Sequence, residues 1–140
     1  MPVRSMADIV RNQDPVVLPP EASVKDACRA MRDRRVGAVL VARDDLTLLG
    51  IFTGRDAVCR VLAEGRDPAK VPLSEAMTAH PDTIVPGKSA VEALQIMSDC
   101  GFRHLPIVER GKIVGIVSHG DFRGLELARH DEHTGLWERI

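Results

Sequence analysis

Residues 50–56 read Gly-Ile-Phe-Thr-Gly-Arg-Asp, and residues 115–121 read Gly-Ile-Val-Ser-His-Gly-Asp. Both stretches follow one pattern: a glycine, two apolar residues, a hydroxyl residue, two variable residues and an aspartate. An apolar run that ends in Thr or Ser, with an acid three residues later, is typical of a strand that turns into a helix through a capping box. Because the pattern occurs twice, it indicates a duplicated structural unit.

The duplication extends through most of the chain. Ser23 corresponds to Ser89 at an offset of 66 residues, and Gly50 corresponds to Gly115 at an offset of 65, so the second copy is one residue shorter between these points. A repeat of this length is a folding unit, and two copies indicate a pseudo-two-fold pair. The seam of such a pair is a place where a ligand can bind.

Each copy predicts the order β-α-β-β-α and therefore a mixed α/β (α+β) fold. The first helix of each copy begins at a serine and carries apolar residues at i, i+3, i+4 and i+7, the spacing of one buried face. The expected strands are 16–18, 37–41 and 48–52 in the first copy, and 83–85, 104–108 and 113–117 in the second. Second helices are expected at 56–63 and 121–127, with buried Val58, Val61, Leu62, Phe122 and Leu125.

The expected boundaries follow from the polar break at residues 64–68, which contains Gly and Pro. We expect one unit at 5–66, a second at 72–128 and a C-terminal tail at 129–140. Short lead-in segments, residues 6–10 and 74–77, begin the two units. The tail is mostly polar, and its Trp137 is expected to pack against other protein, such as another subunit.

Composition argues against several classes of function. The 140 residues carry 19 Lys and Arg against 20 Asp and Glu, whereas a nucleic-acid-binding protein normally has a basic excess. No apolar run approaches the length of about 18 residues that spans a membrane, and the N-terminal residues do not resemble a secretory signal. Three widely spaced cysteines indicate reduced thiols and a cytoplasmic protein.

The repeated motif has two interpretations, which are compatible with each other. In the first, the hydroxyl and the acid only cap a helix. In the second, the hydroxyl and the backbone N–H groups at a helix start accept a phosphate, while the aspartate accepts hydrogen bonds from a ribose diol, as an acid does in dinucleotide-binding folds.

These residues resemble a pair of CBS domains, the regulatory modules named after cystathionine β-synthase. The resemblance rests on the two Gly-x-x-[Thr/Ser]-x-x-Asp segments, the strands at 39–41 and 103–108, and the lead-in Ser74-Glu75-Ala76-Met77. It covers roughly residues 5–128 and is similar to the stand-alone bacterial type. The resemblance implies two units packed through their sheets, with clefts that bind AMP, ADP or ATP and, in some members, NAD or S-adenosylmethionine.

The resemblance also implies roles for individual residues. Asp56 and Asp121 would hold ribose hydroxyls, and Thr53 and Ser118 would face phosphate or ribose. The expected phosphate-side cations are Arg55, Arg103, His104 and His119, and the expected aliphatic walls around adenine are Val17, Ile51, Thr83 and Ile116. The first copy has Gly37-Ala38 where the second has Arg103-His104, so we expect the two sites to differ in affinity or one site to be empty.

The resulting hypothesis is a non-enzymatic sensor of adenosyl ligands that forms a homodimer, a disc of four units, and signals to an unidentified protein. The alternative is a ligand-free interaction protein with vestigial clefts. Ser118, His119 and Asp121 are too close in sequence to form a catalytic triad, which is assembled from separate segments. The tail segment His130-Asp131-Glu132-His133 is interpreted as polar surface rather than a metal site.

Overall fold

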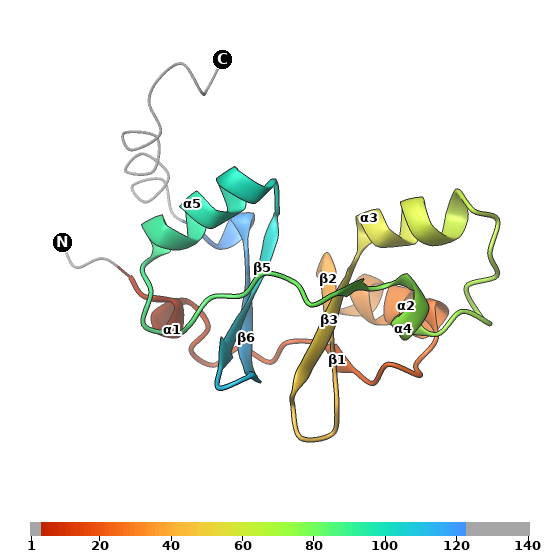
Figure 1. The fold of residues 1–140 in the computed structure, drawn as a ribbon, viewed down its shortest axis with the longest axis horizontal. Helices are drawn as coiled ribbons and strands as arrows, with labels where there is room; N and C mark the ends of the chain where they lie inside the picture. Colours follow the sequence, from red (N-terminus) through yellow and green to blue (C-terminus); the bar gives the residue numbers. More distant parts are fainter. Residues whose placement is uncertain (1–3, 123–140) are drawn as a thin grey trace, which may run out of the picture. The chain divides into compact units, whose positions relative to one another are not determined.

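A computed structural model describes residues 4–122 of the chain (Figure 1). Contacts divide it into two compact units. Among the described residues, the first-repeat unit contains 14–82 and 110–113, and the second-repeat unit contains 4–13, 83–109 and 114–122. No helix within residues 4–122 is both long and apolar enough to cross a bilayer.

The first-repeat unit is a four-stranded sheet with helices. Its sheet has the order β1-β2-β3-β4, in which β1 and β2 are parallel and the other neighbours are antiparallel. All five residues of β2 are buried, as expected for a strand covered on both faces. The elements are β1 Val17–Leu18, α2 Val24–Arg34, β2 Ala38–Ala42, β3 Leu48–Thr53, α3 Gly54–Asp56, the π-helix η1 Ala57–Leu62, α4 Leu73–Ala76 and β4 Thr78–Ala79.

The second-repeat unit contains a two-stranded sheet, β5-β6. Its core includes Met6, Leu94, Met97, Leu105 and Ile107, each no more than 2% exposed. Its elements are α1 Met6–Ile9, α5 Ala90–Cys100, β5 His104–Glu109, β6 Lys112–Ser118 (of which 112–113 belong to the first-repeat unit) and the 3₁₀ turn η2 His119–Asp121. The fold is therefore mixed α/β, as predicted.

Each lead-in helix packs on the other repeat. Met6 N–H donates to the Lys88 carbonyl at 2.8 Å, and Ala90 N–H donates to the Arg4 carbonyl at 3.0 Å, which attaches α1 to the second repeat. In the same way Leu73 N–H donates to the Ala22 carbonyl at 2.8 Å, which attaches α4 to the first repeat. The compact units therefore differ from the contiguous segments 5–66 and 72–128 that the repeat suggests, because backbone hydrogen bonds hold residues 4–13 to the second repeat.

The helix starts and the hairpins agree with the sequence analysis. Ser23 and Ser89 are the N-caps of α2 and α5, and each hydroxyl accepts from the backbone N–H three residues on. The β5-β6 hairpin turns at Arg110 and Gly111, whose φ values of 54° and 79° suit a tight hairpin turn.

Two predictions of secondary structure are wrong. Residues 83–85 form no strand; only Ile84 makes a bridge, to Ile107, and Pro86 has no N–H to continue a ladder. The helix expected at 56–63 begins at Gly54 and continues as a π-helix, whose i→i+5 bonds change the angular spacing of side chains. Val61 is buried as expected, but Val58 and Leu62 are 55% and 68% exposed.

Phe122 is buried, as predicted. The remainder of the helix expected at 121–127, including Leu125, lies outside the described residues, as do the tail, the segment 130–133 and Trp137.

Candidate functional site

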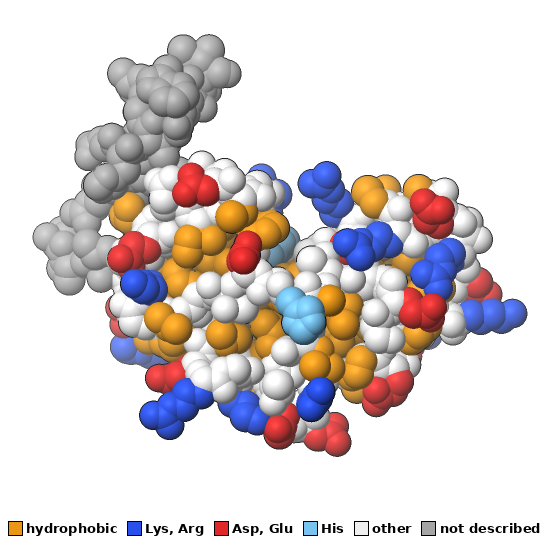
Figure 2. All heavy atoms as spheres, viewed as in Figure 1, with side chains coloured by type: hydrophobic (Ala, Val, Ile, Leu, Met, Phe, Trp, Pro, Cys, Tyr) orange, Lys and Arg blue, Asp and Glu red, His pale blue; other side chains and the backbone are white. Residues whose placement is uncertain are grey.

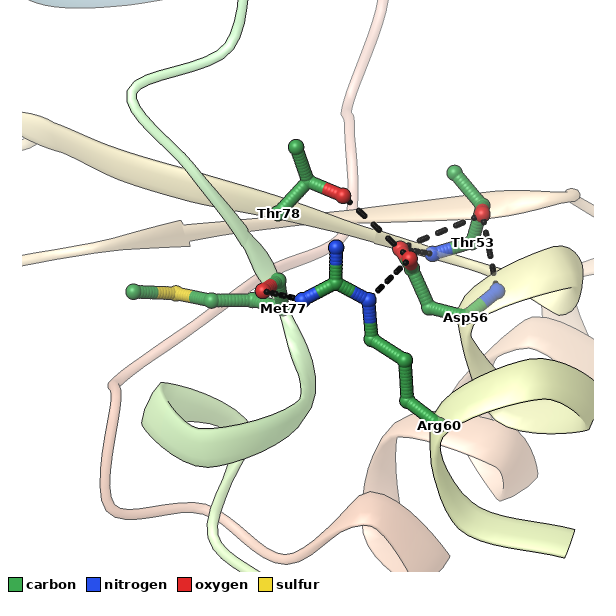
Figure 3. A network of polar contacts seen from close by, with 5 residues as sticks. All are labelled: Thr53, Asp56, Arg60, Met77 and Thr78. Carbon is green, nitrogen blue, oxygen red and sulfur yellow. Dashed lines mark hydrogen bonds and ion pairs between the residues drawn. The ribbon is translucent and has the colours of Figure 1, made fainter. Parts of the chain in front are cut away.

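The first strand-to-helix junction holds its aspartate in a network of polar contacts (Figure 3). Thr53 and Asp56 form the predicted capping box, in which Thr53 N–H donates to Asp56 Oδ2 at 3.0 Å and Asp56 N–H donates to Thr53 Oγ1 at 3.3 Å. The Thr53 hydroxyl also donates to Asp56 Oδ2 at 3.2 Å. This junction therefore satisfies one carboxylate oxygen within its own turn.

The other carboxylate oxygen of Asp56 is also occupied. Thr78 Oγ1 donates to Asp56 Oδ1 at 3.2 Å, and Arg60 Nε lies 3.3 Å from the same oxygen. Arg60 in turn donates from Nη1 to the Met77 carbonyl at 3.1 Å, which anchors the guanidinium to the chain beside β4. The Asp56 side chain is only 10% exposed. Its charge is thus paired and hydrogen-bonded inside the unit, as a buried charge requires.

At the second junction, the described residues contact only one carboxylate oxygen of the aspartate. Ser118 N–H and Ser118 Oγ donate to Asp121 Oδ2 at 2.7 and 3.2 Å, which repeats the contact on one oxygen. Arg4 donates to the backbone carbonyl of Asp121 at 3.0 Å. Asp121 is exposed, and within residues 4–122 no hydrogen bond or ion pair reaches its Oδ1 atom. Of the two aspartates, therefore, only Asp56 has both carboxylate oxygens occupied by described residues.

Basic residues at the start of β5 and in η2 surround the second junction. His119 N–H donates to the Arg103 carbonyl at 2.9 Å, which joins the end of β6 to the start of β5. Burial lowers the pKa of the His104 imidazole below its usual value and Arg103 lowers it further, whereas the negative charge of Asp121 raises it. The exposed Arg103 therefore adds a positive charge to this junction beside that of Arg4, and His104 is a group whose charge depends on its neighbours.

The structure sorts the predicted site residues into two groups. Five lie in the first-repeat unit: Val17, Ile51, Thr53, Arg55 and Asp56. Seven lie in the second-repeat unit: Thr83, Arg103, His104, Ile116, Ser118, His119 and Asp121. Within the second group, hydrogen bonds or charge interactions connect five members: Arg103, His104, Ser118, His119 and Asp121. Ile116 bonds Gln13 instead, and Thr83 is exposed and has no polar side-chain contact in the described part of the chain.

Two residues that contact Asp56, Arg60 and Thr78, were not predicted from the sequence. Arg60 stands four residues after Asp56, the spacing of a helical ion pair, so its signal was present in the sequence. Thr78 is 22 residues from Asp56 and reaches it only because β4 pairs with β3. No comparable local signal identifies Thr78.

An apolar groove lies elsewhere on the first-repeat unit. Its volume is about 160 Å³, and its lining is Val24, Lys25, Cys28, Ala57, Val61, Leu62 and Pro68. Figure 2 shows Lys and Arg interspersed with Asp and Glu on the visible face of the molecule, without a continuous basic patch. Across the described residues, no three His, Cys, Asp or Glu side chains converge as a metal site.

The profile of the CBS domain matches residues 6–62 and 73–127 of this sequence. The chain belongs to the CBS-domain family. The stand-alone CBS domain-containing protein YhcV of Bacillus subtilis is 35% identical over 117 residues, which cover 84% of this chain and 82% of YhcV. CBS domain-containing protein CBSCBSPB2 of Arabidopsis thaliana is 43% identical over 95 residues, 68% of this chain. The matched region spans only 18% of that plant protein.

Solved structures of CBS proteins share the fold. The CBS-domain protein ATU1752 of Agrobacterium tumefaciens superimposes with a TM-score of 0.76 at 31% identity, covering 85% of this chain and 90% of that one. The CBS domain protein PAE2072 of Pyrobaculum aerophilum, solved in complex with AMP, gives a TM-score of 0.81 at 22% identity, covering 91% and 98%. These CBS-pair structures establish the fold of this CBS protein.

Proposed function

We propose that this CBS protein is a non-catalytic regulatory module that binds an adenosyl ligand, with AMP, ADP or ATP as the first choice and NAD or S-adenosylmethionine as the others. The observation that carries the proposal is the exposed carboxylate of Asp121, which Ser118 holds through Oδ2 while Oδ1 stays open among the described residues. A carboxylate oxygen fixed in this way can accept hydrogen bonds from a ribose diol.

The surrounding residues suit the rest of such a ligand. Arg103 and His119 are exposed at the same junction, so they are placed to attract phosphate. His104 gains a proton more readily when an anion is near it, which would strengthen a phosphate contact. Ile116 and Thr83 offer aliphatic surface for adenine. The AMP bound to the Pyrobaculum protein makes AMP the first nucleotide to test.

The first junction carries the same residue types. At this junction, the ligand roles that the resemblance implies for Thr53, Arg55 and Asp56, with Val17 and Ile51 as the aliphatic wall, compete with the contacts that Asp56 makes within its own unit. Its lack of a counterpart to Arg103-His104 weakens the expected phosphate contact, because Gly37 and Ala38 stand there. We therefore propose the second junction as the ligand site.

Isothermal titration with AMP tests the proposal. Asp121→Ala removes charge-assisted hydrogen bonds worth about 1.5–3 kcal/mol each, so the dissociation constant should rise about tenfold or more. Glu109→Ala is the matched control, since Glu109 is an exposed acid of β5 in the same unit without a polar side-chain contact in the described chain. Unchanged affinity in Asp121→Ala, or heat of binding from none of AMP, ATP and NAD, would reject the proposed role.

A ligand-free interaction protein is the second candidate. The contacts at Asp56 favour it, because a carboxylate satisfied on both oxygens by its own chain needs no ligand. In that case both motifs serve only as helix caps. Thermal unfolding midpoints that stay constant with every adenosyl compound would support this alternative. If the protein binds a ligand, that ligand at 100 times its dissociation constant should add about 2.7 kcal/mol to the free energy of unfolding.

Association into a homodimer, the four-unit disc of the family resemblance, is a further part of the proposal. Val58 and Leu62 are 55% and 68% exposed on η1 beside the apolar groove, and such surface favours a protein partner. Leu62→Asp should convert the dimer to a monomer in analytical ultracentrifugation, and Leu46→Asp, at another exposed leucine, should not.

The free thiols of Cys28 and Cys59 support a cytoplasmic setting. We propose neither nucleic acid nor membrane as partner, and the regulated protein is still to be identified.

A further inference from the structure

We infer that Arg60 and Thr78 close the first junction to ligand, so that Asp56 is a structural residue and each chain binds one adenosyl ligand, through Asp121. This inference rests on the proposed function and specifies which of the two equivalent carboxylates serves it.

The two aspartate carboxylates differ in how many of their oxygens are bonded by described protein groups. Asp56 accepts from Thr53 on Oδ2 and contacts Thr78 and Arg60 through Oδ1, at 3.2 and 3.3 Å. Within the described part of the chain, Asp121 repeats the contacts on Oδ2 and not those on Oδ1. A diol that approached Asp56 would have to displace a guanidinium and a hydroxyl, whereas a diol that approached Asp121 displaces neither.

Arg60 is itself held in place by a second contact. Its Nε faces Asp56 while its Nη1 donates to the Met77 carbonyl at 3.1 Å, so one guanidinium joins η1 to the segment that leads into β4 (Figure 3). The next residue, Thr78, is held against β3 by its pairing with Ile51. Release of Asp56 would therefore break contacts of three elements, which makes displacement by a ligand costly.

The described part of the second repeat has no counterpart of the Arg60 and Thr78 contacts. At the offset of 65 that aligns Asp56 with Asp121, Arg60 corresponds to Leu125, which has no charge. Thr78 pairs with Ile51 of β3. At the equivalent residue of β6, Ile116, the contact is made by the side chain of Gln13. The Gln13 amide bonds the Ile116 backbone at 2.7 and 2.8 Å and is thereby engaged away from Asp121. Among residues 4–122, a guanidinium and a threonine hydroxyl therefore occupy the outer carboxylate oxygen only at Asp56.

Titration with AMP, ATP and NAD in turn gives the stoichiometry. The wild type should bind one ligand per chain, Asp121→Ala should lose binding, and Asp56→Ala should keep both stoichiometry and affinity within about twofold. The double variant Arg60→Met/Thr78→Val opens Asp56 and should raise the stoichiometry toward two. Arg66→Met is the matched control, because Arg66 forms a 3.3 Å ion pair with Glu75 in the same unit.

Thermal unfolding tests the structural role of Asp56 without any ligand. Asp56→Ala removes the centre of a buried network and should lower the midpoint by roughly 5–10 °C, whereas Asp121→Ala should change it by about 2 °C or less. Equal midpoints for the two variants would overturn the inference, and so would two ligands per wild-type chain with one lost in Asp56→Ala. If the wild type binds none of the three ligands but the midpoints of the two variants differ as expected, the proposed function is rejected and the structural role of Asp56 is kept.

Discussion

The side-chain amide of Gln13 forms both of the hydrogen bonds that a neighbouring strand would form with the backbone of Ile116. Its amide donates to the Ile116 carbonyl at 2.8 Å, and the Ile116 N–H donates to Gln13 Oε1 at 2.7 Å. In the first-repeat unit the equivalent strand residue, Ile51, pairs with the backbone of Thr78 in β4. One side-chain amide therefore satisfies the edge of β6 where the other sheet uses a fourth strand.

Gln13→Ala should destabilise the protein, because it leaves both backbone groups of Ile116 without these partners. Two hydrogen bonds of ordinary strength predict a loss of about 1–3 kcal/mol in the free energy of unfolding, measured by urea denaturation. Gln13→Glu keeps the acceptor and loses the donor, so it should fall between wild type and Gln13→Ala. A loss below about 0.5 kcal/mol in Gln13→Ala would show that water replaces the amide fully.

The glycines that begin the two motifs, Gly50 and Gly115, lie where another segment passes close to the strand. A Cβ on Gly50 would lie 2.5 Å from Met77 Sδ and 2.8 Å from the Thr78 carbonyl oxygen, and a Cβ on Gly115 would lie 2.6 Å from Gln13 Oε1. Each glycine thus permits close passage of the segment that covers its strand.

Gly50→Ala and Gly115→Ala should both destabilise, by about 1–3 kcal/mol for overpacked positions. Both positions meet an atom that side-chain rotation cannot move, the Thr78 carbonyl oxygen at Gly50 and the Val10 Cβ, 2.9 Å away, at Gly115, so the two losses should be similar. Gly87→Ala is the control, since nothing lies within 4 Å of the Cβ it would add. Equal losses for Gly87→Ala and Gly50→Ala in thermal denaturation would contradict the crowding argument.

The sequence predicted the features that depend on local signals. The serine caps, the apolar spacing of α2 and α5 and the two hairpins each arise from residues within a few positions of one another, and the structure contains them. The exchange of lead-in helices and the Thr78 contact depend on residues far apart along the chain, for which a single sequence has no spacing rule. The exposure of Val58 and Leu62 follows from the π-helix, which an i, i+3, i+4 pattern does not describe.

An exposed ion pair joins the β2-β3 loop to the tip of the β5-β6 hairpin inside the first-repeat unit. Lys112 Nζ lies 2.7 Å from Asp45 Oδ2 and also donates to the Thr47 hydroxyl at 3.0 Å. Lys112 holds the pKa of the Asp45 carboxyl far below its usual range, and contacts with Thr47 lower it further. Lys112→Met should therefore raise the pKa of Asp45 in a carboxyl NMR titration, and 1 M salt should produce part of the same rise in the wild type. Lys25→Met, at an exposed lysine, should leave the titration of Asp45 unchanged.

His104 should make the stability of the protein depend on pH below about 6.5, the usual histidine pKa in an unfolded chain. Burial, and then the charge of Arg103, lower the pKa of His104 in the folded state. The unfolded chain therefore binds a proton that the folded chain resists, so this contribution to stability is complete above pH 6.5 and is lost as the pH falls through the folded pKa. Thermal midpoints measured from pH 7.5 to pH 5 should decline less in His104→Gln than in the wild type, and His80→Gln, at an exposed histidine, should follow the wild type.

The carboxylate of Asp121 acts on His104 in the opposite direction, since its negative charge raises the pKa of the imidazole. Asp121→Asn should therefore lower the pKa of His104 further, and saturation with a phosphate-bearing ligand at this junction should raise it. Imidazole NMR titrations of the wild type, of Asp121→Asn and of the wild type with AMP measure both effects on one proton. If the pKa of His104 were the same in all three samples, neither the charge of Asp121 nor a bound phosphate would be acting on His104.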